Sequence, residues 1–418
     1  MGIPCDDVVQ IRPPEAAGEP TVITINCPDK IGLGCDLCRV ILFFGLSIVR
    51  GDASTDGKWC YVVFWVEGRG KKSTRWGLLK KRLLEACPTA PAASGLYNYY
   101  CWPSEVMATE QKPQVFLLKC CCYDRNGLLH DMTHVLCELE FTILKVKVST
   151  TPDGRVINLF FITDTREFLH TRKRKEETFD HLKLVLGDSI TSFEIEQASG
   201  AISASLQPSH FLPPEISEEM FNIELPEEQQ NGPISKSCVP TVAVDNSLSP
   251  GHSLFQIICQ DHKGLLYDVL RALKDYNMQL SYGRFYTTKK GKCEIDLFVV
   301  QVDGKKILDN CKQKAVCDRL RMEMYKPLRI TVVSRGPDRE LFVANPVELS
   351  GKGRPLVFHD VTLALKILRT QIFLAEVGRH VVSNRVWEVY RFLLEDDESS
   401  ADDNKIIEGV TNMLMGWD

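Results

Sequence analysis

The sequence contains no apolar run of about 18 residues, which is the length that a membrane-spanning helix needs. Its first twenty residues, MGIPCDDVVQIRPPEAAGEP, have no apolar core, so we expect no secretory signal. A net charge of −5 argues against nucleic acid or an anionic membrane as a general partner. We therefore expect a soluble protein of the cytoplasm, with the nucleus as a second location.

Motifs for metals and cofactors are scarce as well. Cys35 and Cys38 form a single C-x-x-C, without a second pair at zinc spacing. SGKGRP at 350–355 lacks the spacing of a phosphate-binding loop. The 16 cysteines lie mostly inside apolar runs, as small buried side chains do, which favours a reducing compartment over a disulfide framework. We expect no metal and no cofactor.

What the sequence does contain is a repeated stretch. CPDKIGLGCDL at 27–37 returns as CYDRNGLLHDM at 122–132 and as CQDHKGLLYDV at 259–269. Each copy has Cys, Asp, Gly, Leu and a second Asp at the same offsets. The chain has 418 residues, of which 44% are hydrophobic and 25% charged, and is long enough for about three globular domains. The repetition indicates several copies of one fold.

Each copy lies between a β-rich run and an amphipathic helix. In the third copy, Leu265, Val269 and Leu273 share one face of the predicted helix. Two extended runs follow, separated by a turn, and then a second helix and a short last strand. The order β-α-β-β-α-β over about 80 residues predicts an α+β, ferredoxin-like unit, an antiparallel sheet with two helices on one face. The last strands are predicted at 95–101, 190–196 and 328–334.

A fourth, altered copy follows the third. Asp360 and Ile372 keep the twelve-residue offset between the second Asp and the second strand that the other copies have. Leu356, however, occupies the position of the motif glycine, and the loop before it is longer. The chain ends before a last strand could form, so we expect a structural copy that lacks this strand.

The spacing of the copies predicts two pairs of repeats. Residues 198–250 are rich in Pro, Ser and acidic residues, as linkers are. Only short segments join repeat one to two and repeat three to four, so we expect these neighbours to pair. The predicted divisions are a tail at 1–19, repeats at 20–102, 113–197, 252–334 and 339–418, and the linker at 198–250.

D-x-x-G-L at the first strand-to-helix turn of a repeated βαββαβ unit resembles the ACT domain, the regulatory module of amino-acid metabolism. Four units, with SRGPDRELFVANPVELSGKGRPLVFHDVTLALKIL at 334–368, resemble the plant ACT domain repeat proteins. They are also similar to the C-terminal sensor region of bacterial uridylyltransferase. The resemblance implies a small amino acid where two ACT domains meet, held by the first strand–helix loop and the start of the second strand. The implied residues are Asp29, Gly32, Leu33, Ser47, Asp124, Gly127, Leu128, Thr142, Asp261, Gly264, Leu265 and Gln279.

The chemistry of this loop suits a zwitterion. A helix N-terminus offers unpaired N–H groups to a carboxylate, and a glycine lets the backbone approach a ligand closely. The neighbouring Asp could bind the ammonium group. The alternative is that the first Asp only caps the helix, for about 1 kcal/mol, and that the second Asp only complements the helix dipole.

Other functions find less support in the sequence. HDMTH at 130–134 resembles a zinc-binding helix, but Asp131 is the second Asp of the repeat. KWCYVVF at 58–64 approaches an RNA-binding strand, yet the other copies lack its aromatic pair, and we expect Trp59 and Tyr61 to pack against a neighbouring repeat. The basic run at 171–177 is either a solvated surface or a weak nuclear import signal.

Taken with the resemblance, these observations predict a non-catalytic protein that binds a free amino acid and signals to a protein partner. Glutamine is the first candidate, by similarity to the uridylyltransferase sensor region. The alternative is an interaction scaffold whose ACT edges bind protein, or a second copy of the chain, without a small ligand. No nucleophile–base pair supports an enzyme.

Overall fold

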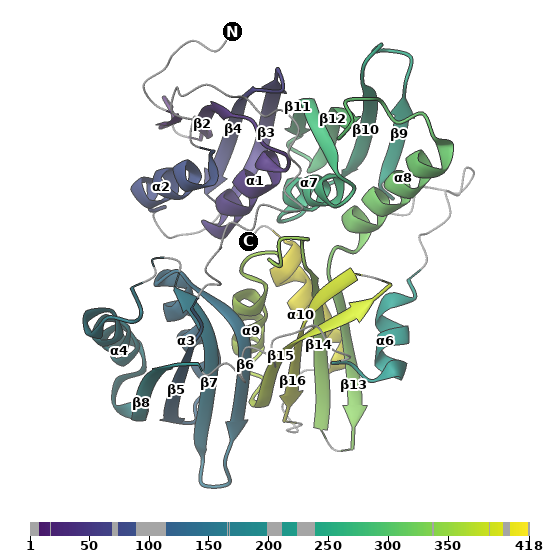
Figure 1. The fold of residues 1–418 in the computed structure, drawn as a ribbon. Coiled ribbons are helices and arrows are strands. Elements are labelled where there is room, and N and C mark those ends of the chain that lie inside the picture. The colour runs from purple at the N-terminus through teal and green to yellow at the C-terminus, as the bar shows by residue number, and fades with distance from the viewer. Residues whose placement is uncertain are drawn as a thin grey trace. The chain divides into compact units, whose positions relative to one another are not determined.

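The computed structural model describes residues 8–16, 18–68, 74–88, 114–164, 166, 168–198, 211–223, 239–336, 338–383, 385–395 and 402–416. The chain divides into two compact units, and each is assembled from separate segments (Figure 1). The first unit comprises 1–94, 224–327 and 415–418, and the second comprises 95–223 and 328–414. Each unit therefore combines two repeats that lie far apart in the sequence.

The first unit contains repeats one and three. Repeat one consists of β2 (Thr21–Pro28), α1 (Leu33–Phe43), β3 (Leu46–Thr55), β4 (Trp59–Gly68) and α2 (Trp76–Ala86), preceded by β1 (Val9–Arg12). Repeat three consists of β10 (Ser253–Gln260), α7 (Leu265–Asp275), β11 (Met278–Thr287), β12 (Lys292–Gln301) and α8 (Asn310–Tyr325), preceded by β9 (Thr241–Asp245). Their strands form one eight-stranded sheet in the order β1-β2-β4-β3-β11-β12-β10-β9.

The second unit contains repeats two and four. Repeat two consists of β5 (Phe116–Tyr123), α3 (Leu128–Glu138), β6 (Phe141–Thr150), β7 (Arg155–Asp164), α4 (Arg172–Leu186) and β8 (Ile190–Gln197). Repeat four consists of β14 (Asp338–Pro346), α9 (Val357–Ile367), β15 (Ile372–Val382), β16 (Arg385–Leu394) and α10 (Asp403–Met415), preceded by β13 (Arg329–Arg335). The sheet order is β13-β14-β16-β15-β6-β7-β5-β8.

The fold class predicted from the sequence is confirmed, but the predicted partners within each pair are wrong. Repeat one joins repeat three through antiparallel β3 and β11, where Asp52 lies opposite Arg284. Repeat two joins repeat four through β6 and β15, where Val148 lies opposite Ala375. Helix α1 also packs on α7, and α3 on α9. Proximity in sequence misled the prediction, because pairing depends on which sheet edges complement each other.

In each repeat, the strand that pairs with the outer side of the first strand comes from one of two places in the chain. In repeat two, β8 follows the second helix and pairs with β5, as predicted. In repeats one, three and four, the strand beside the first strand instead precedes it in the chain: β1, β9 and β13. The predicted strand at 328–334 forms as β13, yet it pairs with β14 of repeat four. The predicted strand at 95–101 lies outside the described residues.

Repeat four is therefore more complete than the sequence indicates. Within the described residues no strand follows α10, in agreement with the prediction, but β13 supplies the fourth strand of this half of the sheet. Strand β13 lies before the expected start of the repeat, and a hairpin brings it alongside β14.

The stretch at 198–250, predicted as a linker, contains two ordered elements. Strand β9 pairs with β10, and α6 (Pro214–Phe221) packs near β13 in the second unit. Leu212 and Met220 are buried with Phe342 and Trp387 on the sheet face. The linker interpretation is wrong for these parts. The segment is polar overall, but a few of its apolar residues pack on the sheet.

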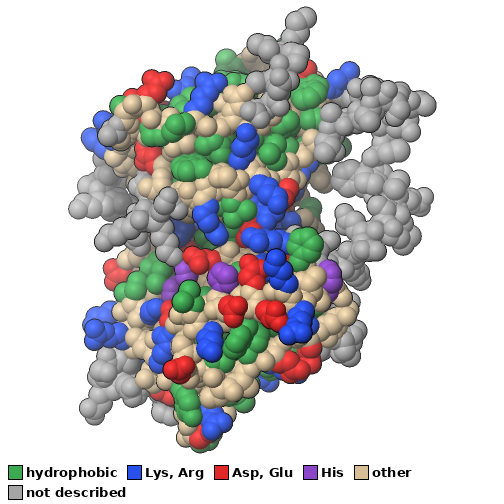
Figure 2. All heavy atoms as spheres, turned by 90° about the vertical axis from the view of Figure 1, so that its left-hand side faces the viewer, with side chains coloured by type: hydrophobic (Ala, Val, Ile, Leu, Met, Phe, Trp, Pro, Cys, Tyr) green, Lys and Arg blue, Asp and Glu red, His purple; other side chains and the backbone are tan. Residues whose placement is uncertain are grey.

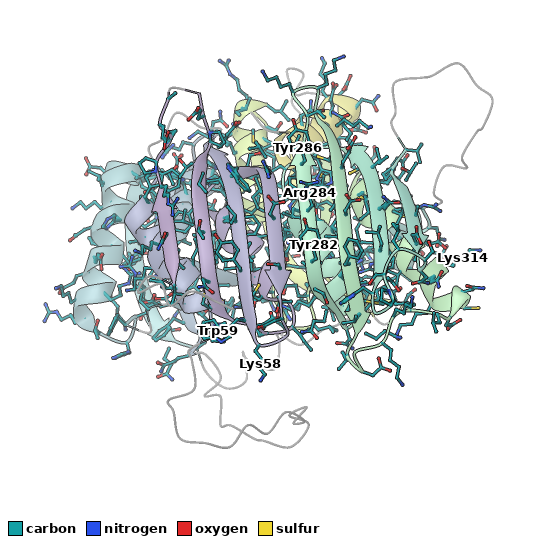
Figure 3. All side chains as sticks on the ribbon, turned by 90° about the horizontal axis from the view of Figure 1, so that it is seen from above. Lys58, Trp59, Tyr282, Arg284, Tyr286 and Lys314 are labelled. Carbon is teal, nitrogen blue, oxygen red and sulfur yellow. The ribbon has the colours of Figure 1, made fainter. Side chains whose placement is uncertain are left out.

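The helices of the first unit cover one face of its sheet, and the opposite face carries aromatic side chains. Figure 2 shows acidic and basic side chains interspersed on the face of the molecule drawn there. Figure 3 shows Tyr282, Arg284 and Tyr286 in a row along β11. Trp59 and Tyr61 are 44% and 50% exposed, so the expectation that they pack against a neighbouring repeat is wrong.

No helix in the described part of the chain is long and apolar enough to cross a membrane.

Expressing residues 1–223 and 224–418 as two separate chains tests the pairing. Each compact unit takes one repeat from each fragment, so the fragments should form a stable one-to-one complex, recovered through an affinity tag on either one. Size-exclusion chromatography with light scattering reports the stoichiometry. Two fragments that elute as independent folded proteins would instead support the pairing of repeat one with two.

Candidate functional site

A glycine in the left-handed backbone region begins the first helix of three repeats. Gly32, Gly127 and Gly264 have φ angles of 78°, 77° and 80°, and each is the N-cap of its helix. The first Asp of the motif lies three residues earlier, so it is not the N-cap. The capping alternative is therefore wrong for Asp29, Asp124 and Asp261, and their carboxylates face other groups.

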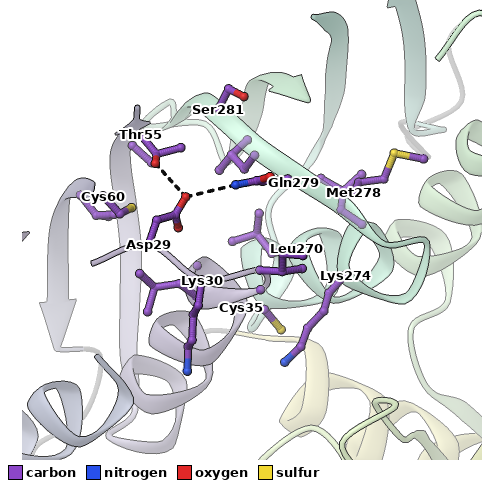
Figure 4. Close-up of a pocket in the computed structure, with 18 of the residues that line it drawn as sticks. Asp29, Lys30, Cys35, Thr55, Cys60, Leu270, Lys274, Met278, Gln279 and Ser281 are labelled. Carbon is purple, nitrogen blue, oxygen red and sulfur yellow. Dashed lines mark hydrogen bonds between the residues drawn. The ribbon is translucent and has the colours of Figure 1, made fainter. Parts of the chain in front are cut away.

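In the first unit, Asp29 is the meeting point of two repeats. Its Oδ2 accepts hydrogen bonds from Thr55 Oγ1 at 2.7 Å and from Gln279 Nε2 at 3.4 Å (Figure 4). Thr55 ends β3 of repeat one, whereas Gln279 is the second residue of β11 of repeat three. The Asp29 backbone N–H donates to the Lys58 carbonyl at 2.8 Å and fixes the loop on the β3–β4 hairpin. The first loop of repeat one and Gln279 of repeat three thus line the same hollow.

Two lysines line this hollow, and their ammonium groups lie at the first turn of α1 (Figure 4). Lys30 and Lys274 contact the Asp36 carboxylate at 2.7 and 2.9 Å. Burial by itself raises the pKa of Asp36, but the hydrogen bonds from these lysines outweigh it, and the pKa is lowered. The stem of Lys274 crosses the turn so closely that a Cβ on Gly32 would lie 2.7 Å from its Cδ. Because Gly32 has no Cβ, it leaves room for the side chain of Lys274 from the partner repeat.

The second unit contains the same arrangement. Arg125 and Lys366 each contact the Asp131 carboxylate at 2.6 Å. A Cβ on Gly127 would lie 2.5 Å from Lys366 Cδ. The hollow beside Asp124 is also lined by Gln371, which immediately precedes β15. These residues correspond to ones in the first unit, but Thr150, the counterpart of Thr55, has a buried Oγ1 without a hydrogen-bond partner among the described residues.

Asp124 differs from a fully solvated carboxylate. Burial raises the pKa of Asp124, and a hydrogen bond from the Arg125 backbone N–H opposes this only in part. Such a carboxylate gains from a neighbouring cation, because a positive charge favours its ionised form. This property fits a site for an ammonium group.

The loop of repeat three has different neighbours. Its hollow is lined by Leu42 and Ile48 of repeat one, with no lysine at the place where Lys274 lies in the first site. Ser47, the counterpart of Gln279, is fully buried, and its Oγ has no hydrogen-bond partner among the described residues. The second Asp of this repeat, Asp268, is buried beside Arg271 of its own helix at 3.2 Å.

The loop of repeat four is closed by its own residues. Gly353 stands at the position of the first Asp, and a Cβ there would lie 2.7 Å from Asn345 Nδ2. Asn345 also donates to the Arg354 carbonyl and to the Tyr390 hydroxyl. Leu356 keeps the left-handed turn, with φ of 64°. Thr142, the corresponding second-strand residue of repeat two, is exposed.

The structure regroups the residues predicted from the sequence. Asp29 lies with Gln279 and not with Ser47, and Asp124 lies with Gln371 and not with Thr142. Leu33, Leu128 and Leu265 are buried where their helices begin, and each lines its hollow. The hollows at the loops of repeats one, two and three enclose about 580, 450 and 300 Å³, open space at their mouths included.

Sequence reasoning missed Lys274 and Lys366. Both stand six residues after the second Asp of their repeats, where repeats one and two have Leu42 and Cys137. This difference between copies was visible in the sequence. Its meaning required the pairing of repeats, because each lysine acts on the loop of its partner.

Three histidines from α3 and α9 meet in the second unit. His134 Nδ1 lies 3.2 Å from His359 Nε2, and the rings of His130 and His359 are 4.8 Å apart. Burial lowers the pKa of His130 to about 4. Over the described ranges, no group of three His, Cys, Asp or Glu side chains could hold a metal ion. The cluster is a contact between paired repeats.

The basic run at 171–177 forms the start of α4. Thr171 caps the helix by accepting a hydrogen bond from the Arg174 N–H. The Arg174 guanidinium is buried and donates to Asp164 at 3.2 Å and to the Leu139 carbonyl at 2.6 Å. One cation of the run thus serves the fold, which weakens its interpretation as a nuclear import signal.

Comparison with known proteins agrees with this architecture. Family models match three parts of the chain: "ACT domain-containing protein ACR10, N-terminal" at 11–88, "ACR9-like, ACT-like domain" at 241–338, and "ACT domain-containing protein ACR9, C-terminal" at 339–416. ACR10 of Arabidopsis thaliana is 56% identical over 420 residues, and ACR9 of the same plant 51% over 423 residues, each across 100% of both chains. The bifunctional uridylyltransferase/uridylyl-removing enzyme of Rhodospirillum rubrum is 27% identical over 199 residues, which cover 47% of this chain and 18% of the enzyme.

The left-handed turn of repeat four leads to a stability prediction. Leu356→Val should lower the free energy of unfolding by about 1–2 kcal/mol, because a β-branched residue tolerates positive φ poorly. Leu356→Gly is the matched variant: it relieves about 1 kcal/mol of backbone strain and loses the contacts of a half-buried leucine. Thermal melting of both variants against the wild type measures the difference. Equal melting temperatures for valine and leucine would contradict the strained turn.

Proposed function

Since the chain belongs to the family of ACT domain-containing proteins that includes ACR9 and ACR10, we propose that it is a non-catalytic regulatory protein that binds a free amino acid. The ligand lies between paired repeats, and its binding is passed to a protein partner. The family supports a regulatory role, and the geometry of the two matching hollows supports the ligand.

The charged side chains that line one hollow carry this proposal. Asp29 offers a carboxylate that is positioned by Thr55 and Gln279. Lys30 and Lys274 also line this hollow, and both contact the carboxylate of Asp36 at the first turn of α1. Gly34, whose backbone N–H belongs to the first turn of α1, lines the same hollow. An α-amino acid carries the complementary ammonium and carboxylate groups.

Recurrence of the arrangement in the second unit strengthens the proposal. A single such cluster could stabilise an interface and nothing more, because ion pairs at repeat contacts are common. Here Asp124, Lys366 and Gln371 repeat the same chemistry on different local sequence. Glutamine is the first candidate ligand, because uridylyltransferase matches part of this chain.

A protein partner has a candidate surface on the first unit. Tyr282, Tyr286 and Trp59 are exposed on the open face of the sheet, with Arg284 between the tyrosines along β11 (Figure 3). Tyr, Trp and Arg are enriched in protein interfaces. The same surface favours the second candidate function, a scaffold that binds protein without a small ligand. We further propose that the protein is located in the cytoplasm or the nucleus.

A thermal-shift screen with the twenty L-amino acids tests the proposal. At 100 times its dissociation constant, a ligand should stabilise the folded state by about 2.7 kcal/mol, or roughly 5–10 °C for a pair of repeats. Asp29→Ala and Asp124→Ala should each reduce the shift while the melting temperature of the free protein changes little. If no amino acid shifts the wild type at tens of millimolar, the scaffold function takes its place.

The pH dependence of binding gives a second prediction. Protonated Asp124 is neutral and cannot pair with an ammonium group, and its pKa lies above the ordinary value near 3.8. Binding in the second unit should therefore weaken as the pH is lowered toward 4. Asp131 stays ionised over this range, because its cation partners lower its pKa against the effect of burial.

Calorimetric titration between pH 7 and pH 4 measures this effect. Asp124→Asn is the control, and its residual binding in the second unit should not vary with pH through this group. Affinity that stays constant to pH 4 in the wild type would place the ammonium group elsewhere.

A further inference from the structure

We propose that each chain binds two ligand molecules, one per compact unit, and that Lys274 and Lys366 are the ligand-carboxylate-binding residues that make the loops of repeats one and two into sites. This inference rests on the proposed function and adds the number of sites and the residues that determine it. Repeats one and two provide the loops. Repeats three and four provide the lysine and the glutamine.

The position of Lys274 carries the first step. Its ammonium group lies at the first turn of α1, held at Asp36 Oδ1, and its stem covers Gly32. The hollow between Asp29 and this turn is also lined by Gly34, whose backbone N–H belongs to the first turn of the helix. Among the residues that line this hollow, Lys274 is the cation that repeat three contributes.

Asp36 and Asp131 each contact a second cation, so the lysine of the partner repeat can move from the aspartate to a ligand carboxylate. When Lys274 turns from Asp36 to a ligand carboxylate, Lys30 still neutralises Asp36 at 2.7 Å. In the second unit, Arg125 does the same for Asp131 when Lys366 turns. Neither carboxylate is left as an unpaired charge, which would be costly in a partly buried position. The paired cations thus let the lysine be shared between protein and ligand.

The remaining two loops lack these groups. The loop of repeat three faces Leu42 where the other sites have lysine, and its second Asp, Asp268, is already neutralised by Arg271. The loop of repeat four has Gly353 in place of the first Asp and is filled by the side chain of Asn345. The same pairing of repeats that creates two sites therefore offers Leu42 and Cys137 to the two opposite loops, at the positions that Lys274 and Lys366 occupy in their own repeats.

Calorimetry on the full chain tests the inference. L-glutamine is titrated first and then the other nineteen L-amino acids, and whichever binds is compared with its α-carboxamide, which lacks the negative charge. The wild type should bind two molecules. Lys274→Met and Lys366→Met keep an unbranched stem over the glycine, and each should weaken one site by about tenfold or more. Lys274→Arg should restore part of the loss.

Two comparisons separate a binding lysine from a structural one. Lys292→Met and Lys119→Met remove lysines that pair with surface carboxylates outside the hollows, and both should bind like the wild type. The α-carboxamide should bind the wild type about tenfold more weakly than the amino acid, but the Lys274→Met, Lys366→Met double variant should not distinguish the two compounds.

Each outcome decides between the proposals. Three bound molecules, or a double variant whose affinity lies within threefold of the wild type, would overturn the lysine assignment and leave amino-acid binding intact. A wild type that binds none of the twenty amino acids would overturn both. If the double variant still bound the amino acid more tightly than its α-carboxamide, the ligand carboxylate would be assigned to the helix N-terminus alone.

Discussion

Antiparallel pairing between the second strands of distant repeats is the constraint on which both units depend. A four-stranded repeat leaves its second strand at an edge, with unpaired N–H and C=O groups that need a partner. Strand β3 meets β11, and β6 meets β15. The same pairing places the start of one second strand beside the first loop of the other repeat. Gln279 thereby reaches Asp29, 250 positions earlier in the chain.

Local features of this fold could be predicted from the sequence because they depend on local chemistry. The D-x-x-G-L motif marks a turn that requires positive φ, and Gly32, Gly127 and Gly264 adopt it. The twelve-residue offset from the second Asp holds because it spans one helix of fixed length. Leu356 has the same turn with φ of 64°, which the sequence did not predict because leucine rarely adopts positive φ.

Features that depend on distant contacts could not be read in the same way. Hydrophobic alternation identified the strand at 328–334, but alternation does not say which sheet a strand joins, and β13 lies beside β14. Composition marked 198–250 as a linker, although Leu212 and Met220 complete a buried cluster with Phe342. For the site, the family resemblance implied both Asp29 and Gln279 but not that they share a hollow, because each hollow contains one loop and one strand from different repeats.

In the proposed function, the pairing also links ligand binding to the assembly of each unit. Asp36 and Asp131 accept cations from the partner repeat, whereas Asp268 and Asp360 are buried beside groups of their own helices. The paired repeats are therefore unequal: one presents an open loop, and the other presents the side chains that close it. A ligand held at both ends would contact both repeats, so its binding free energy would add to the stability of their contact. A partner that distinguishes a tight from a loose pair of repeats could then sense the amino acid without touching it.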